Sequence, residues 1–193
     1  RELWMKLGGF ISEYKKSYNM SFVGADFESK FLRNDDLSDI VYFFVYNFLF
    51  LYDLDKNTRR DLLQNEFSRL KILDLVCNLA LIIDEVLKQA YLKSKGNKYE
   101  KMFQGVTWYC NEKNLISQTD LENYCKNDLK INDDQPDNVI PRLLSKSEKY
   151  NGSIIKNEVL SLLIAYHLRN HGGHNIDQQN ILSSKYDEII LNL

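Results

Sequence analysis

All three histidines of the chain lie within eight residues, beside an arginine–asparagine pair. His167, His171 and His174 flank Arg169 and Asn170 in the segment AYHLRNHGGHNID. Histidine is the side chain that most readily gains or loses a proton near neutral pH, and arginine binds phosphate through paired N–H donors. The segment therefore predicts proton transfer at a phosphate group.

The two glycines that follow His171 have a geometrical role in this prediction. Arg169 and His174 are five positions apart, roughly 140° around an ideal helix, so a straight helix would point the two side chains apart. A helix that ends near His171, followed by Gly172 and Gly173 with their access to positive φ, returns His174 toward Arg169. We therefore expect the helix to end there.

A metal site and a purely structural role are the alternatives for the same residues. His167 and His171 are one helical turn apart, so with His174 and Asp177 they could ligate a metal ion. The fixed charge of Arg169 disfavours a second cation at that place, and we expect no metal or other cofactor. In the structural alternative, Arg169 complements the C-terminal dipole of a helix and His174 is a surface residue beyond it.

The rest of the sequence predicts helices. Only two prolines occur, Pro136 and Pro141, so the strongest helix breaker is absent from most of the chain. From Thr58 to about Lys95, apolar residues recur at steps of three and four without any glycine or proline, which is the pattern of a long amphipathic helix. Gly96, with Asn97, is expected to end it.

Further helices are expected after this long one. They are a short helix at Thr119–Leu129, a strong apolar helix from Ile154 to about Asn170, and a final helix from Ser183 to Leu193. Between them, Asn132–Asn138 is a loop by composition and Asn151–Ser153 is a turn that begins the strong helix. The fold class that we expect is all-α, a helical bundle.

The first 57 residues are expected to form a helical appendage, or a linker from a preceding domain, and residues 58–193 the main domain. The most apolar run, Ile40–Tyr52, has 13 residues with Asn47 in its middle, too few to span a bilayer. We expect its tyrosines and phenylalanines in the core or at a subunit interface. Stacking on nucleic-acid bases is the alternative.

Charge and cysteine content limit the class of protein. The formal net charge is −2, so any contact with nucleic acid is expected to be local or shared with a second subunit. Cys77, Cys110 and Cys125 lie far apart, and we expect them to be reduced, buried thiols, as in a cytoplasmic protein. The first ten residues contain no signal peptide.

The motif Arg169-Asn170-x-x-x-His174 resembles the R-x4–6-H signature of the HEPN superfamily, in which asparagine often follows the arginine directly. The order of elements is similar over about residues 58–193: a long amphipathic helix first, and a late apolar helix that leads into the motif. The resemblance implies an all-α bundle of the HEPN type. It also implies a ribonuclease that cleaves single-stranded RNA without a metal and leaves a 2′,3′-cyclic phosphate.

The resemblance assigns roles to individual residues. His174 would act as general base or acid, Arg169 would stabilise charge on the phosphoryl oxygens, and Asn170 would orient these groups or the scissile phosphate. His171 and His167 are additional to the motif and would have supporting roles. In this superfamily an acidic residue of the long helix sometimes supports the site, here Asp84 or Glu85, although a solvated helix face is the simpler expectation for both.

The resemblance also implies partners. HEPN domains usually form homodimers in which two motifs face one cleft, and a sensor domain could precede Arg1, as in CRISPR ancillary nucleases and abortive-infection proteins of antiviral defence. In a toxin–antitoxin branch of the superfamily a tyrosine stands two residues after the histidine, whereas Ile176 stands there in this chain. The competing hypothesis is a HEPN-like helical module that binds another protein and has no activity.

Overall fold

The computed structural model describes residues 24–57, 66–96, 98–171 and 184–193, with five isolated positions before residue 24. Within these residues the fold is all-α, as expected, apart from one short hairpin of β1 (Lys149–Tyr150) and β2 (Ser153–Ile154). The principal helices are α3 (Ser38–Asn57), α5 (Glu66–Lys95), α6 (Met102–Glu112), α8 (Pro136–Leu144) and α9 (Asn157–His171). The shorter ones are α2 (Gly24–Phe27), η1 (Glu28–Leu32), η2 (Asp35–Leu37), α7 (Gln118–Asn123), η3 (Tyr124–Asp128) and α11 (Tyr186–Asn192).

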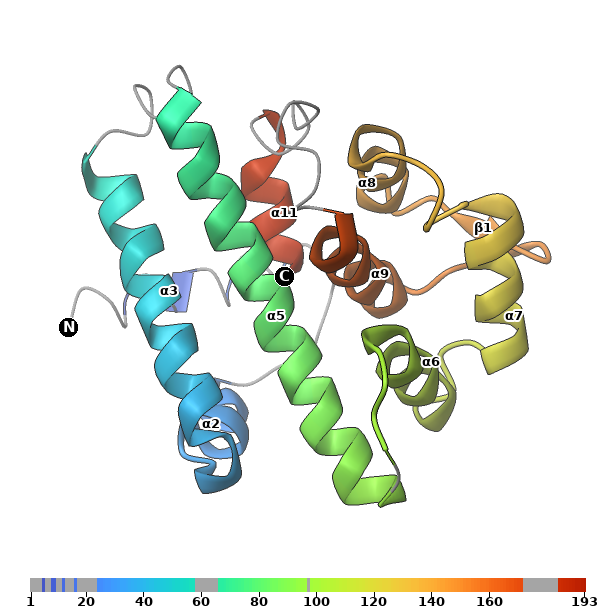
Figure 1. Ribbon diagram of the computed structural model, residues 1–193, viewed down its shortest axis with the longest axis horizontal. Coiled ribbons are helices and arrows are strands. Elements are labelled where there is room, and N and C mark those ends of the chain that lie inside the picture. Colours follow the sequence, from blue (N-terminus) through green and yellow to red (C-terminus); the bar gives the residue numbers. More distant parts are fainter. Residues whose placement is uncertain are drawn as a thin grey trace.

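The long helix α5 packs against α3, α6, α9 and α11. Figure 1 shows it running between α3 on one side and α6 and α9 on the other, with α11 alongside. Its apolar residues at helical spacing are buried, among them Val76, Ala80 and Leu87, because one stripe faces α9 and α6 while another faces α3. The prediction of a long helix is confirmed over residues 66–95, and Gly96 follows it with φ of +64°.

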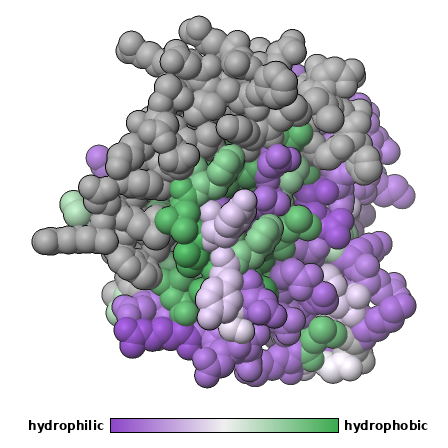
Figure 2. Space-filling model, turned by 60° about the vertical axis from the view of Figure 1, so that its left-hand side comes forward, coloured by the Kyte–Doolittle hydropathy of each residue, from purple (hydrophilic) through white to green (hydrophobic). Residues whose placement is uncertain are grey.

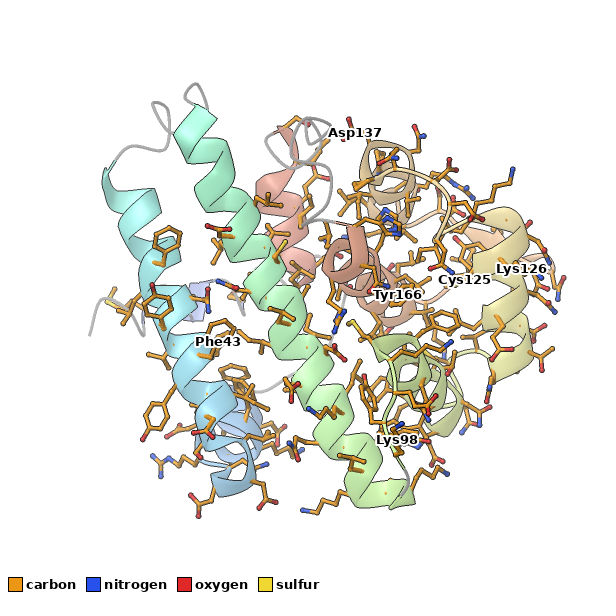
Figure 3. The ribbon with its side chains drawn as sticks, in the orientation of Figure 1. Phe43, Lys98, Cys125, Lys126, Asp137 and Tyr166 are labelled. Carbon is orange, nitrogen blue, oxygen red and sulfur yellow. The ribbon has the colours of Figure 1, made fainter. Side chains whose placement is uncertain are left out.

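Helix α9 lies at the centre of the core. Val159, Leu163, Ile164 and Leu168 are fully buried, because α5, α6, α8 and α11 all pack against this helix. Tyr166 of α9, labelled in Figure 3, lies against an aromatic ring of α6 and donates a hydrogen bond to the loop before α8. Arg169, in the last turn, is the one exposed residue of α9.

Two local predictions were wrong. The loop expected at Asn132–Asn138 ends at Gln135, because Pro136 begins α8, where a helix requires no N–H from its first residue. The turn at Asn151–Gly152 joins β1 to β2 and does not begin the helix, which starts at Asn157. Both of these turn residues have positive φ, 49° and 78°, which suits a tight hairpin.

The apolar run of α3 divides between two environments. Phe44 and Phe48 face the core, where Phe44 packs edge-on against Phe27 of α2. Tyr42 and Tyr46 are 74% and 64% exposed, and Figure 2 brings this side of the molecule forward. The expected core position is confirmed for only part of the run. Among the described residues, no helix is long and apolar enough to cross a membrane.

Asn47, in the middle of that run, is buried and tied to α5. It accepts a hydrogen bond of 3.0 Å from Asn78 and donates one of 2.7 Å to the carbonyl of Phe43. A buried amide costs free energy unless it is paired, so this contact fixes how α3 lies on α5. The division of the chain at residue 57 stays a prediction, and residues 58–65 lie outside the described part.

Candidate active site

The predicted motif begins on the last turn of α9. The described part of the helix reaches His171, and Arg169 and Asn170 stand on its last turn. The predicted break at the two glycines stays a prediction. His174, Gly172, Gly173 and Asp177 lie outside the described residues.

Arg169 is held by a carboxylate of the long helix. Its Nε donates a hydrogen bond of 2.7 Å to Oδ2 of Asp84, which lies 85 residues earlier on α5. The Asp84 side chain is only 9% exposed, whereas that of Arg169 is 41% exposed. A buried carboxylate requires a charged partner, so this pair has a strong preference for its observed geometry. The expectation of a solvated face was wrong for Asp84.

A tyrosine that the sequence did not single out completes this group. The hydroxyl of Tyr99 donates a hydrogen bond of 2.7 Å to Oδ1 of Asp84, so each oxygen of the carboxylate accepts one bond. Burial, and then the bond to Asp84, raise the pKa of Tyr99 far above its usual range. Its hydroxyl therefore stays protonated at neutral pH and can always donate this hydrogen bond. We call Tyr99, Asp84 and Arg169 the site triad.

The neighbouring residues are less tightly arranged. Asn170 accepts a hydrogen bond from Nη1 of Arg169 at 3.5 Å, the limit of a hydrogen bond. Glu85, the other acidic residue considered on α5, pairs with Lys88 at 3.0 Å on a half-exposed surface, as expected for a solvated face. The two candidates on the long helix therefore differ, and of the two only Asp84 is hydrogen-bonded to the described part of the motif.

His167 is a buried, neutral imidazole. Its Nδ1 lies 2.8 Å from the carbonyl oxygen of Ile131, which can only accept, so Nδ1 carries the proton. Burial, and then the proximity of His171, lower the pKa of His167 to about 4. The two rings stack with centroids 4.5 Å apart. His167 is fully buried and cannot reach a substrate, so any role in the site passes through His171.

The metal hypothesis receives no support from the described residues, which contain no group of three or more potential ligands. His174 and Asp177, two members of the hypothetical metal site, lie outside that part of the chain. The cysteines are free thiols: Cys110 and Cys125 are buried and Cys77 is half-buried. Burial raises the pKa of each thiol, to about 12, 12 and 11 respectively, so they are unreactive at neutral pH.

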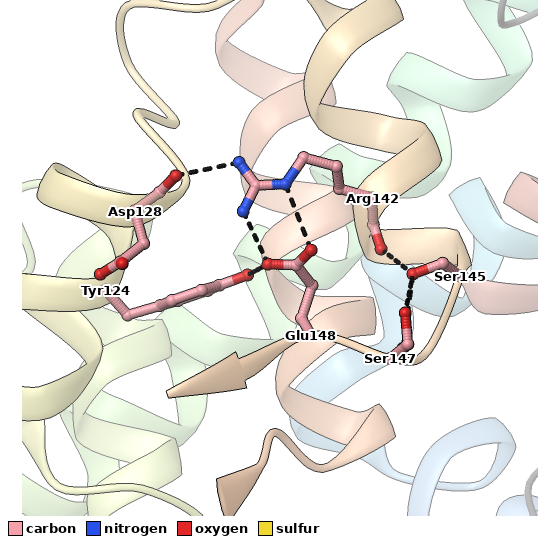
Figure 4. Close-up of polar contacts among 6 residues, drawn as sticks. All are labelled: Tyr124, Asp128, Arg142, Ser145, Ser147 and Glu148. Atoms are coloured by element: carbon pink, nitrogen blue, oxygen red, sulfur yellow. Dashed lines mark hydrogen bonds and ion pairs between the residues drawn. The ribbon is translucent and has the colours of Figure 1, made fainter. Parts of the chain in front are cut away.

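A second group of a tyrosine, a carboxylate and an arginine lies on elements other than α5 and α9, and we call it the hairpin triad. Tyr124 donates to Oε2 of Glu148 at 2.7 Å, and Arg142 donates to both oxygens of Glu148 at 2.8 and 3.2 Å. Arg142 also donates to the carbonyl of Asp128 at 2.9 Å (Figure 4). The group joins η3, α8 and the residue before β1, and the sequence did not predict it.

No family model, curated protein or solved structure matches this chain. The function is therefore inferred from the site itself and from the resemblance of its motif.

Proposed function

We propose that this chain is a HEPN-type ribonuclease domain that cleaves single-stranded RNA without a metal ion. The observation that carries the proposal is the ion pair between the motif arginine, Arg169, and the buried Asp84 of the long helix. A cation fixed in this way at the exposed end of a rigid helix needs little reorganisation to bind a phosphate. The all-α fold with a late motif helix agrees with the proposed type.

The reaction is an attack of the RNA on itself. A base removes the proton of the 2′-hydroxyl, the 2′-oxygen forms a bond to the adjacent phosphorus, and the bond from phosphorus to the 5′-oxygen breaks. An acid gives a proton to that leaving oxygen. The products are a 2′,3′-cyclic phosphate and a 5′-hydroxyl end, and no water or metal is consumed.

Each residue of the motif has a part in this reaction. Arg169 binds the phosphoryl oxygens and stabilises the charge that develops on them. His174 is the base or the acid, and Asn170 limits the movement of the arginine through their mutual hydrogen bond. His171, stacked on His167, is a supporting residue at the end of α9.

The proposal includes a homodimer, because one histidine per motif supplies either the acid or the base, and two facing motifs supply both. A shared cleft also concentrates two arginines, which compensates for the net charge of −2. A cytoplasmic location, an upstream sensor domain and a part in antiviral defence, as in CRISPR-associated nucleases, follow from the HEPN resemblance.

A second candidate function is a binding module without activity. It is favoured by the exposed apolar residues of α3, since such a stripe commonly marks a protein interface. The residues are Tyr42, Phe43, Tyr46 and Leu49. In this case, changing Tyr42 and Tyr46 would abolish binding of a partner, whereas changing Arg169 would have no effect.

The test is cleavage of a labelled single-stranded RNA in the presence of EDTA. The parent chain is compared with Arg169→Ala and His174→Ala, and with Arg142→Ala as a control from the hairpin triad. We expect the parent and the folded control to yield cyclic-phosphate ends, and both motif variants to lose at least about 100-fold in rate. Circular dichroism checks that each variant is folded. Equal cleavage by parent and motif variants, or none by a folded dimer, would contradict the proposal.

A further inference from the structure

We propose that Tyr99 is a positioning residue for Arg169, acting through Asp84, and that Gly105 provides the space in which Tyr99 reaches the carboxylate. The inference rests on the proposed function, in which Arg169 binds phosphate. It adds two residues outside the motif, from the loop after α5 and from α6, to those on which cleavage depends.

The first step of the argument is the orientation of Asp84. Tyr99 and Arg169 occupy different oxygens of the same carboxylate, each at 2.7 Å. Without the tyrosine hydroxyl, one oxygen of a nearly buried carboxylate would have no hydrogen-bond donor, and this costs free energy. Rotation of the carboxylate toward another donor would recover part of that free energy. Such a rotation moves Oδ2, and with it the guanidinium of Arg169.

The second step is the position of Tyr99 itself. Its ring packs edge-on against Tyr91, with centroids 5.7 Å apart. Gly105 also lies against this side chain: a Cβ atom there would stand 2.8 Å from the hydroxyl oxygen of Tyr99 and 3.2 Å from Cβ of Leu87 on α5. A methyl group at position 105 would therefore push the tyrosine hydroxyl, which is the end of a long side chain, away from Asp84.

The third step is that two different substitutions act on one contact. Tyr99→Phe removes the hydroxyl and leaves the ring, whereas Gly105→Ala keeps the hydroxyl and displaces it. Tyr124→Phe is the matched control, because Tyr124 also donates at 2.7 Å to a carboxylate that is paired with an arginine, in the hairpin triad. All three variants lose one hydrogen bond of the same kind, and only two of the variants affect the site triad.

The experiment measures RNA cleavage and the state of Arg169 in the same samples. We expect Tyr99→Phe and Gly105→Ala to lower kcat by about 10- to 100-fold with KM within about twofold, since a small displacement of a positioned group has this effect. We expect Tyr124→Phe to leave both constants unchanged in the folded protein. The ¹⁵N-labelled Nε–H resonance of Arg169, assigned by its absence in Arg169→Lys, should shift and exchange faster in the first two variants only.

The two readouts separate this inference from the proposed function. If the parent does not cleave RNA, the proposed function fails, and the Nε–H resonance alone decides whether Tyr99 positions Arg169. An unchanged resonance in folded Tyr99→Phe overturns the inference, with or without cleavage. An equal loss of kcat in Tyr124→Phe would also overturn it, because the effect would then be one of general stability.

Discussion

In both the site triad and the hairpin triad a tyrosine and an arginine donate to one carboxylate, Asp84 in the first and Glu148 in the second, but the two arginines differ in their hydrogen bonds. Both arginine side chains are 41% exposed. Arg142 donates from Nε, Nη1 and Nη2, all to partners within the protein. Arg169 donates from Nε and, weakly, from Nη1, and among the described residues its Nη2 donates no hydrogen bond. Arg142 is thus held from three nitrogens, whereas within the described residues Arg169 is held mainly through Nε.

The side chains next to the two arginines also differ. Next to Arg169 on α9 are two stacked imidazoles, His167 and His171, which can influence proton transfer. Next to Arg142 are the hydroxyls of Ser145 and Ser147, hydrogen-bonded to each other at 2.8 Å, and these do not titrate near neutral pH. Two arginines of equal exposure therefore differ in their hydrogen bonds and in their neighbours.

The largest expected effect comes from replacing each arginine by lysine. A lysine keeps the charge and loses the planar set of donors, so we expect Arg169→Lys to lower the rate of RNA cleavage by about 100-fold. Arg142→Lys should instead lower the free energy of unfolding by about 1–3 kcal/mol through its lost hydrogen bonds and leave the rate unchanged. Urea unfolding and single-turnover cleavage measure both quantities, and a loss of rate in Arg142→Lys would break the comparison.

Lowering the pH should reduce the contributions of His167 and Glu148 to the free energy of unfolding in different pH ranges. His167 is neutral in both states above its ordinary pKa of 6.5, but between pH 6.5 and 4 only the unfolded chain binds the proton. The free energy of unfolding then falls with decreasing pH, by about 3 kcal/mol at pH 4. For Glu148, burial favours a higher pKa, but hydrogen bonds from Arg142 and Tyr124 outweigh it and hold the pKa below the ordinary value of 4.5. Its stabilising contribution is thus lost only as the pH falls below about 4.5.

Two variants separate these contributions in urea unfolding measured from pH 7 to pH 4. His167→Asn, whose amide replaces Nδ1 as the donor to Ile131, should reduce the loss of stability between pH 6.5 and 4. Glu148→Gln should keep that slope, lower the free energy of unfolding by a constant amount above about pH 4.5, and lack the further decline that the parent shows below it. If His167→Asn retains the full slope above pH 4.5, another group causes it and the imidazole is not neutral in the folded state.

Local patterns predicted much of the fold, and they placed Arg169 and Asn170 of the motif on the late apolar helix, α9. Helical spacing indicated α5 and α9, because it is a property of neighbouring residues. The break predicted from the glycines after His171 lies outside the described residues. The HEPN assignment itself stays a prediction, and His174 is not among the residues that the structure places. The β-hairpin was missed because Asn151 and Gly152 were interpreted only as a helix start, although the same residues suit a tight turn between strands.

The partner of Arg169 could not be found from its neighbours in sequence, since Asp84 reaches it only when α5 and α9 pack together. One signal for Asp84 was nevertheless present. Ala80, Leu87 and Tyr91 lie on the same helical stripe as Asp84, and all are buried. A carboxylate on an apolar stripe of a helix is expected to require a cationic partner. The position of Asp84 on this stripe therefore predicts such a partner. Tyr99 carries no comparable signal, because its position depends on the space left by Gly105.

The smallest expected effect is that of Ser145→Ala, in the shell around the hairpin triad. The Ser145 hydroxyl donates to the carbonyl of Arg142 at 2.6 Å, at the end of α8. Since the residue is exposed and water can replace the bond, we expect the free energy of unfolding to fall by about 0.5–1 kcal/mol, with no change in RNA cleavage. Ser29→Ala is the control, because Ser29 is also exposed and makes the same type of bond at 3.4 Å, so its loss should be smaller. A lower cleavage rate in Ser145→Ala would mean that the hairpin triad also sets the geometry of the proposed site, and the contrast drawn between Arg142 and Arg169 would then be wrong.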